Sequence, residues 1–218
     1  MVDFYVNAIT GSCRKVLVFL QNLDFIHDFY LAGGTALALQ IGHRISTDLD
    51  WFSATNILQS PQREYIQREL KISEEFETIS EGDGLLFTRL FDTDTSFIYQ
   101  HHPLLAPGVE YERVKLATPH DIGLMKLAAI ASRGTRRDFV DIYSLRDIVS
   151  IEDLFVLAPE KYTDRPQFLS VVLRALAYFE DAEQQPMPKM LVPVRWKDVR
   201  AYCEEVSRNM TRRLSGLT

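Results

Sequence analysis

The stretch YLAGGTALALQIGHRISTDLDWF, residues 30–52, holds the pattern that decides the fold. Two glycines, Gly33 and Gly34, end a short apolar run, and two aspartates, Asp48 and Asp50, follow after a helix-length interval. Either the glycines make a plain tight turn and the aspartates are solvated surface residues, or the stretch holds a phosphate and a metal ion. Both interpretations predict the same backbone structure, and they differ in whether its polar residues bind a ligand.

The elements around these residues are predicted by short-range patterns. Residues 28–32 are aromatic and apolar and end at glycine, which is typical of a buried strand. Residues 33–40 predict a helix with small residues at its start, and residues 47–53 alternate polar and apolar side chains as a strand does. The order strand, glycine pair, helix, strand therefore predicts an α/β core.

The glycine pair and the helix behind it fit an anion. Glycine lets the backbone approach a ligand closely and adopt dihedral angles that other residues avoid. The N-terminus of a helix presents N–H groups without helical partners and the positive end of the helix dipole. With the hydroxyl of Thr35 as a further donor, Gly33 and Gly34 are candidate phosphate-binding residues.

Asp48 and Asp50 fit a divalent cation. Alternate residues of a strand project from the same face, so the two carboxylates share one face while Leu49 and Trp51 point into the core. Two adjacent carboxylates repel each other, and a cation removes that penalty. Mg²⁺ prefers oxygen ligands, usually one or two carboxylates together with substrate phosphates. Asp48 and Asp50 are therefore candidate metal ligands of a nucleotide site.

The composition is that of a globular protein. The chain has 218 residues, 46% hydrophobic and 25% charged, which suffices for one well-cored domain or a core with a helical extension. No apolar run approaches the roughly 18 residues of a membrane span, and we expect no secretory signal. Cys13 and Cys203 lie far apart without CxxC spacing, so we expect free thiols and a cytoplasmic protein.

The net charge of −6 argues against a general nucleic-acid binder, which carries a basic excess. The charge is unevenly distributed along the chain. Residues 60–94 carry four positive and nine negative side chains, whereas residues 189–213 carry seven positive and three negative ones. We therefore expect any polyanion to meet the C-terminal part.

The remaining patterns divide the chain near residue 117. Further strands are predicted at 75–80, 84–91, 95–100 and 111–118, with EGDG (81–84) as a hairpin turn. Helices are predicted at 12–23, 63–70, 119–132, 136–149, 166–181 and 195–209. We expect an α/β core over residues 1–117 and a helical region over residues 118–218.

A second group of polar residues lies in the stretch 117–145. Lys126 and Arg133 are seven apart on one predicted helix and lie on nearly the same face. Asp141 heads an apolar stripe on the next helix, so its carboxylate should be partly buried and need a cationic partner. Lys126 or Arg133 could provide one, either in a salt bridge that ties two helices together or in an active site. Asp138 could equally be a helix cap.

The run RGTRR, residues 133–137, allows the same two interpretations. On average such a run is a solvated loop. If it faces a nucleotide site, its arginines, Arg133 and Arg136 among them, would hold a triphosphate or an RNA backbone.

These blocks resemble a known family. The AGG at residues 32–34, followed after thirteen residues by DLD at residues 48–50, is similar to the hG[GS] and [DE]h[DE] motif of the DNA polymerase β-like nucleotidyltransferase superfamily. More narrowly, GGTALALQIGHRISTDLDWFS resembles the AbiEii/AbiGii-type nucleotidyltransferase toxins, where the GGTAL start and the HR.S.DLD end are typical. The stretches 96–105 and 117–145 resemble further blocks of that family, and the likeness covers roughly residues 28–150.

The resemblance implies a polymerase β-like nucleotidyltransferase fold, with a small mixed sheet followed by a helical C-terminal half. It also implies transfer of a nucleoside monophosphate from an NTP to an acceptor hydroxyl, with release of pyrophosphate. It implies that Asp48 and Asp50 hold Mg²⁺ and that Lys126 and Asp141 are further catalytic residues. The nucleotide-binding residues that it implies are Gly33, Gly34, Thr35, Ser46, Arg133, Arg136 and Asp138. Residues 118–218 would complete the active-site cleft.

The resemblance also implies the toxin of an AbiE-like toxin–antitoxin pair, with an antitoxin as partner and RNA, such as a tRNA 3′ end, as acceptor. Two other functions stay open: a nucleotidyltransferase that modifies a protein or small molecule, and a catalytically silent module that binds nucleotide or antitoxin. Intact Asp48, Asp50 and Lys126 argue against the silent module. Superfamily members often have a third carboxylate on a neighbouring strand; Asp92 and Asp94 are candidates, and no motif selects either.

Overall fold

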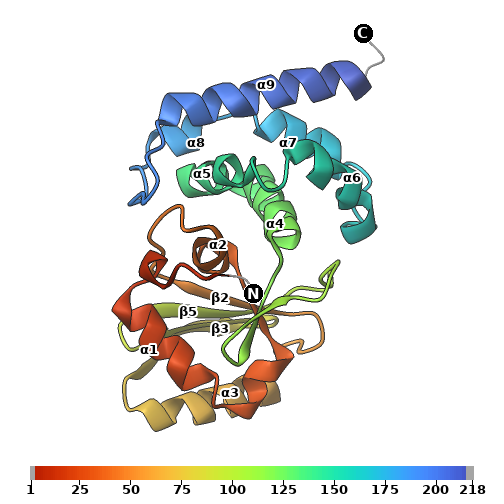
Figure 1. The fold of residues 1–218 in the computed structure, drawn as a ribbon. Helices are drawn as coiled ribbons and strands as arrows, with labels where there is room; N and C mark the ends of the chain where they lie inside the picture. Colours follow the sequence, from red (N-terminus) through yellow and green to blue (C-terminus); the bar gives the residue numbers. More distant parts are fainter. Residues whose placement is uncertain (1–2, 215–218) are drawn as a thin grey trace. The chain divides into compact units, whose positions relative to one another are not determined.

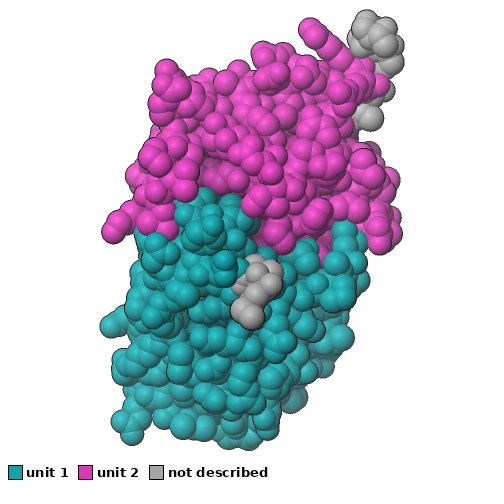
Figure 2. Space-filling view, in the orientation of Figure 1, with its two compact units in different colours: residues 1–118 teal, residues 119–218 magenta. Residues whose placement is uncertain are grey.

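The chain divides between Thr118 and Pro119 into two units, coloured separately in Figure 2. The computed structural model describes residues 3–214. Unit 1 comprises residues 1–118 and unit 2 residues 119–218. The described part of unit 1 is built around a sheet, and the described part of unit 2 consists of helices and loops. The chain is thus of the mixed α/β class that the sequence predicted.

The described residues of unit 1 form a mixed seven-stranded sheet (Figure 1). Its strands are β1 (Tyr30–Ala32), β2 (Leu49–Ser53), β3 (Phe76–Gly82), β4 (Leu85–Leu90), β5 (Thr93–Tyr99), β6 (Val109–Tyr111) and β7 (Val114–Leu116). Their order is β3-β4-β5-β2-β1-β7-β6, with β1 parallel to β7, β2 parallel to β5, and the other neighbours antiparallel. The two strands that flank the polar motif, β1 and β2, therefore pair with each other inside the sheet.

Three helices accompany this sheet. They are α1 (Gly11–Leu20), α2 (Gly33–Ile41) and α3 (Ser60–Leu70), with single 3-10 turns η1 (Val6–Ala8), η2 (Asp24–Asp28) and η3 (Lys71–Ser73). Figure 1 shows α2 above the strands and α3 below them. Helix α2 is buried over residues 34–39, and it ends at Gly42, whose left-handed φ of 64° makes the C-cap.

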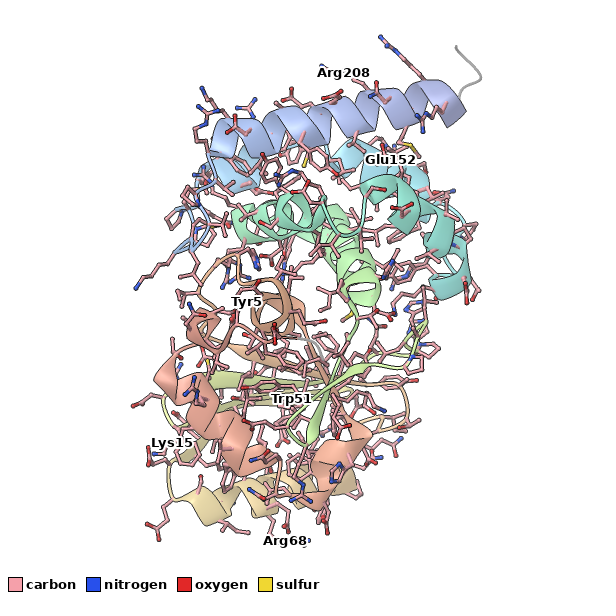
Figure 3. The ribbon with its side chains drawn as sticks, viewed as in Figure 1. Tyr5, Lys15, Trp51, Arg68, Glu152 and Arg208 are labelled. Carbon is pink, nitrogen blue, oxygen red and sulfur yellow. The ribbon has the colours of Figure 1, made fainter. Side chains whose placement is uncertain are left out.

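One face of the sheet is the apolar core of unit 1. Trp51 of β2 and Phe97 of β5 are opposite one another in the register, and both are completely buried; Figure 3 labels Trp51 amid the sheet. The ring of Phe97 packs edge-on against Phe25 and Phe29, with centroids 5.7 and 5.4 Å away. Because strand side chains alternate, Asp50 projects from the other face.

The prediction of a single strand over residues 111–118 is wrong. The structure has two short antiparallel strands there, β6 and β7, in which Tyr111 is opposite Val114. Glu112 makes the tight turn with a left-handed φ of 53°. A turn built from Glu and Arg carries none of the glycine, asparagine or proline signals that mark turns in a sequence.

Unit 2 is a set of helices. They are α4 (Pro119–Ser132), α5 (Arg136–Leu145), α6 (Ile151–Lys161), α7 (Phe168–Ala175), α8 (Glu180–Glu183) and α9 (Trp196–Leu214). The predicted helix at 166–181 is divided into α7 and α8, and α6 was not predicted at all. A proline, Pro159, lies inside α6 and hides it from pattern reasoning, although a capping box of Ser150 and Asp153 marks its start.

The helices of unit 2 are joined by packed aromatic rings and by buried ion pairs, among them one between α4 and α6. Phe139 of α5, Phe179 beside α8 and Trp196 of α9 have ring centroids 5.0 to 6.0 Å apart. Lys161 Nζ of α6 lies 2.6 Å from Asp121 Oδ1 of α4, and both side chains are fully buried. Among residues 3–214, no helix combines the length and apolar character that crossing a bilayer requires.

Candidate active site

The turn at Gly33 brings the glycine pair against the DxD strand. Ala32 ends β1, and Gly33 has a left-handed φ of 65°, which favours glycine because other residues are strained there. In the antiparallel register Ala32 is opposite Asp50. As a result, a Cβ at position 33 would stand 2.7 Å from Asp50 Oδ2. The carboxylate of Asp50 thus lies close to the glycine turn, in the space that a side chain at position 33 would need.

The second glycine faces a different side chain. A Cβ at position 34 would overlap Nη2 of Arg44 and stand 3.3 Å from Ser46 Oγ. Arg44 and Ser46 are only 3% and 1% exposed, and Arg44 Nη1 donates to Ser46 Oγ at 3.4 Å. The sequence interpretation included Ser46 and missed Arg44, although the arginine lies two residues before it in the same HRxSxD run.

Two hydroxyl groups, those of Thr35 and Ser46, contact Asp48. Thr35 Oγ1 donates to the backbone carbonyl oxygen of Asp48, and Thr35 is 1% exposed. The proton of this hydroxyl is therefore directed at the chain, so we propose that Thr35 acts by positioning Asp48. Ser46 Oγ donates to Asp48 Oδ1 at 3.4 Å and so contacts the carboxylate itself.

Asp48 and Asp50 have the chemistry of a hard-cation site. Asp50 lies in β2 and Asp48 immediately precedes that strand, and both are partly exposed. Because alternate residues of an extended chain share a face, the two carboxylates offer oxygen atoms on the side opposite Trp51. Partly exposed carboxylate oxygens that can keep water in the coordination shell suit Mg²⁺. The donor set of this turn and strand fits the metal that the sequence predicted.

The neighbouring strand places a hydroxyl beside Asp50. Strand β5 runs parallel to β2, and Ser96 is opposite Asp50 in the register. Of the two aspartates considered as a third carboxylate, Asp94 accepts hydrogen bonds from Arg89 Nε and Nη2 at 2.9 and 2.8 Å. Asp92 lies outside the strands in the β4–β5 turn, with a φ of 58°.

The predicted polar residues of unit 2 form one ion cluster. Lys126 Nζ of α4 lies 3.0 Å from Asp138 Oδ1 and 2.6 Å from Asp141 Oδ2, both on α5. The two carboxylates are buried, and the lysine side chain is 8% exposed. Arg133 Nε lies 3.1 Å from Asp138 Oδ2, while most of the Arg133 side chain remains exposed. The cluster ties α4 to α5.

Asp138 is also part of the helix cap of α5. Thr135 is the N-cap residue, and its hydroxyl donates to Asp138 Oδ2 at 2.6 Å. Burial alone would raise the pKa of the Asp138 carboxyl. The charge of Lys126 and the guanidinium and hydroxyl of Arg133 and Thr135 outweigh burial and hold this pKa below its ordinary value. Asp138 is therefore ionised at neutral pH despite its burial.

The guanidinium of Arg136 binds backbone carbonyl groups of α8. Its Nε donates to the carbonyl oxygen of Ala182 at 2.8 Å and its Nη2 to that of Glu183 at 3.0 Å. The guanidinium also lies 4.7 Å from the ring of Trp196. These contacts attach the start of α5 to α8 and α9, so the Arg136 guanidinium is directed at the interior of unit 2. A nucleotide-binding role for Arg136 stays a prediction.

The comparison with known families covers both units. A family model described as "Nucleotidyl transferase AbiEii toxin, Type IV TA system" matches residues 16–209. An uncharacterized protein of Aquifex aeolicus (strain VF5), aq_aa25, is 31% identical over 210 residues, which cover 92% of this chain and 93% of that protein. The matched region includes the glycine turn, the aspartate pair and the ion cluster of unit 2.

Solved structures share the fold at low identity. A protein of Helicobacter pylori described as a nucleotidyltransferase is 15% identical, with coverage of 98% of this chain and 99% of that one and a TM-score of 0.53. MenT4, a nucleotidyltransferase toxin from Mycobacterium tuberculosis, is 18% identical, with coverage of 84% and 75% and a TM-score of 0.55. The predicted nucleotidyltransferase fold is confirmed.

Proposed function

Because the chain belongs to the AbiEii family of nucleotidyltransferase toxins, we propose that it transfers a nucleoside monophosphate from an NTP to a hydroxyl of an RNA acceptor, with Mg²⁺ as cofactor. The observation that carries this proposal is the position of Asp50 Oδ2, only 2.7 Å from where a Cβ on Gly33 would stand. It puts a candidate metal ligand on the same turn as a candidate phosphate site. A metal-bound triphosphate needs both together.

The residues of unit 1 would bind and orient the triphosphate. The backbone N–H groups at the start of α2, from Gly33 onward, would donate to phosphate oxygens, aided by the positive end of the helix dipole. Asp48 and Asp50 would hold Mg²⁺, and Ser46 Oγ lies next to Asp48 as a further hydrogen-bonding group. When bound, Mg²⁺ neutralises the charge that develops on the phosphates during transfer.

The ion cluster of unit 2 would serve the same nucleotide. Lys126 carries a buried ammonium, and such a charge in a low-dielectric site attracts phosphate more strongly than it does in water. Asp138 and Asp141 hold this ammonium from two sides and so act as positioning residues. In this proposal Lys126 neutralises the triphosphate and the departing pyrophosphate, and residues 118–218 complete the active site.

RNA is the acceptor that we favour. The family is one of toxins in toxin–antitoxin systems, and the basic stretch 189–213 includes most of α9, where Arg208 is exposed (Figure 3). A tRNA 3′ end offers a hydroxyl with a small electrostatic footprint, which suits a chain of net charge −6. We also propose a cognate antitoxin and a cytoplasmic location; the free, buried Cys13 and Cys203 are consistent with a reducing compartment.

Label transfer tests this function directly. The protein is incubated with each of the four NTPs, labelled at the α-phosphate, together with total RNA or total protein, with and without Mg²⁺. We expect label in RNA, dependent on Mg²⁺, and lost in Asp48→Asn and Asp50→Asn. Asp83→Asn is the matched control, because Asp83 lies in the β3–β4 turn with a side chain that is 96% exposed.

The molecule that becomes labelled identifies the acceptor. Label in a protein band, with none in RNA, would reject the RNA acceptor and keep the nucleotidyltransferase. Full transfer by both Asp48→Asn and Asp50→Asn would refute the metal site. No label in any acceptor, while NTP still binds, would favour the silent nucleotide-binding module.

A further inference from the structure

We propose that Arg44 is a phosphate-binding residue of unit 1, with its guanidinium placed by Gly34 to bind the triphosphate chain beside the metal ligands. This inference rests on the proposed function, since it concerns the same nucleotide. It adds a cation to the glycine turn and the aspartate pair, which otherwise supply backbone N–H groups and acidic ligands.

The two glycines of the turn accommodate two side chains of opposite charge. A Cβ on Gly33 would meet Asp50 Oδ2, and a Cβ on Gly34 would overlap Arg44 Nη2. Only Gly33 has a left-handed φ, so backbone conformation explains the glycine at position 33 and leaves the one at 34 without that reason. The space that Gly34 leaves open is filled by the guanidinium.

The local chain path delivers Arg44 to this place. Helix α2 ends at Gly42, and the chain returns towards β2 within a few residues. Arg44 Nη1 donates to the carbonyl oxygen of Ile45 at 3.2 Å and to Ser46 Oγ at 3.4 Å. These two hydrogen bonds are made by Nη1, and Nη2 lies against Gly34. The guanidinium therefore lies between Ser46 and the glycine turn.

The chemistry of this guanidinium suits a phosphate chain. Arginine stays protonated at any physiological pH, and its planar fork of donors matches phosphate oxygens in pairs. Arg44 is 3% exposed, so its charge acts in a medium of lower dielectric constant than water. In the proposed complex, Asp50 would hold the metal ion and Arg44, beside Gly34, would bind anionic phosphate oxygens. The opposite charges at positions 50 and 44 match that arrangement.

The competing explanation is purely structural. Arg44 could serve as a strut that holds the loop of residues 44–48 through Ser46, which in turn contacts Asp48. A strut would act on the metal ligands, so its removal would weaken metal binding and lower thermal stability. A phosphate ligand would act on the anion and leave metal binding in the absence of phosphate unchanged.

Three variants of the full chain separate these roles: Arg44→Gln, Arg44→Lys and Gly34→Ala. Calorimetry measures the binding of three probes: Mn²⁺ alone, inorganic tripolyphosphate with Mg²⁺, and NTP with Mg²⁺. The melting temperature of each variant is measured as well. We expect Arg44→Gln to weaken tripolyphosphate and NTP binding about ten- to a hundredfold, as for a lost charge-assisted hydrogen bond. Mn²⁺ binding should stay within about twofold, and Arg44→Lys should recover part of the loss.

Gly34→Ala probes the placement of the guanidinium without removing its charge. The added methyl overlaps Nη2, and alanine is otherwise acceptable in a helix. It should weaken tripolyphosphate binding in the parent protein and have little further effect in the Arg44→Gln background. Such non-additivity is the signature of two residues that act through one contact.

The outcomes separate this inference from the proposed function. Unchanged tripolyphosphate binding in Arg44→Gln overturns the role of Arg44, as does a parallel loss of Mn²⁺ binding and melting temperature. If the parent protein binds neither tripolyphosphate nor NTP, both proposals fail. If tripolyphosphate binds through Arg44 while no NTP transfers its label, the phosphate site stands and the transferase function falls.

Discussion

Lys126 Nζ lies 2.6 Å from Asp141 Oδ2, and the same ammonium lies 3.0 Å from Asp138 Oδ1. Lys126 on α4 thus contacts two buried carboxylates on α5, and Arg133 contacts one of them as well. The arrangement matters for stability as well as for chemistry, because a buried charge without a partner is costly. The structural and the catalytic interpretation of this cluster are therefore compatible.

Lys126→Met should destabilise unit 2 strongly. It leaves Asp138 and Asp141 buried near one another, and breaking a buried pair costs about 3–5 kcal/mol. Urea unfolding at neutral pH measures the loss. Arg133→Met is the matched control: its side chain is 64% exposed, so we expect about 1 kcal/mol or less. Equal losses in the two variants would contradict the central place of Lys126.

The lowered pKa of Asp138 predicts a pH dependence of stability. Its folded-state pKa lies below the unfolded value of about 3.9, so the folded state binds fewer protons. The contribution of Asp138 is therefore fully present above about pH 4 and is lost as pH falls through the folded pKa. Asp138→Asn should cost stability at pH 7 and progressively less below pH ~4. A deficit independent of pH, measured by urea unfolding, would contradict this.

Gly33→Ala should damage both the fold and the site. The left-handed φ of 65° strains alanine by about 1–2 kcal/mol, and the new methyl would meet the Asp50 carboxylate at 2.7 Å. We expect a lower melting temperature and loss of label transfer. Gly11→Ala is the control, because no atom lies within 4 Å of its added Cβ. Activity that survives in Gly33→Ala would show that Asp50 tolerates displacement from the turn.

Arg136 and Arg137, two of the three arginines of the RGTRR run, should differ in their effects. Arg136→Ala removes hydrogen bonds to the carbonyl oxygens of Ala182 and Glu183 and the contact with Trp196, which should cost about 2 kcal/mol. Arg137 is exposed, so Arg137→Ala should leave stability nearly unchanged. If RNA contacts this run, Arg137→Ala should weaken RNA labelling at low salt and make the labelling less dependent on salt. Equal melting temperatures for the two variants would contradict the structural role of Arg136.

The polar motif was predictable from sequence because its geometry is local. The glycine pair, the helix behind it and the alternation of Asp48 and Asp50 depend on the conformation of adjacent residues. The salt bridge of Lys126 with Asp141 was predictable for a similar reason, since a carboxylate heading an apolar stripe needs a partner. The family resemblance then linked the two groups of residues.

The remaining features depend on tertiary contacts that no short pattern contains. Arg44 reaches Gly34 because the chain returns after α2, and sequence spacing does not state where a side chain points. Arg136 looked like a solvated or ligand-binding arginine and instead satisfies carbonyl oxygens at α8. Helix α6 was hidden by Pro159, and the β6–β7 turn at Glu112 carries no turn residue.

The parallel pairing of β1 with β7 has a consequence for synthesis on the ribosome. Leu31 pairs with Leu116, so β1 acquires its second neighbour only after most of unit 1 has been translated. Until then the nascent chain carries an incomplete sheet, and such non-local pairing slows folding. A chain interrupted before Leu116 would contain the whole glycine and aspartate motif and lack the strand that completes the sheet around β1. The glycine and aspartate motif is therefore set in a complete sheet only after more than half of the 218 residues have been made.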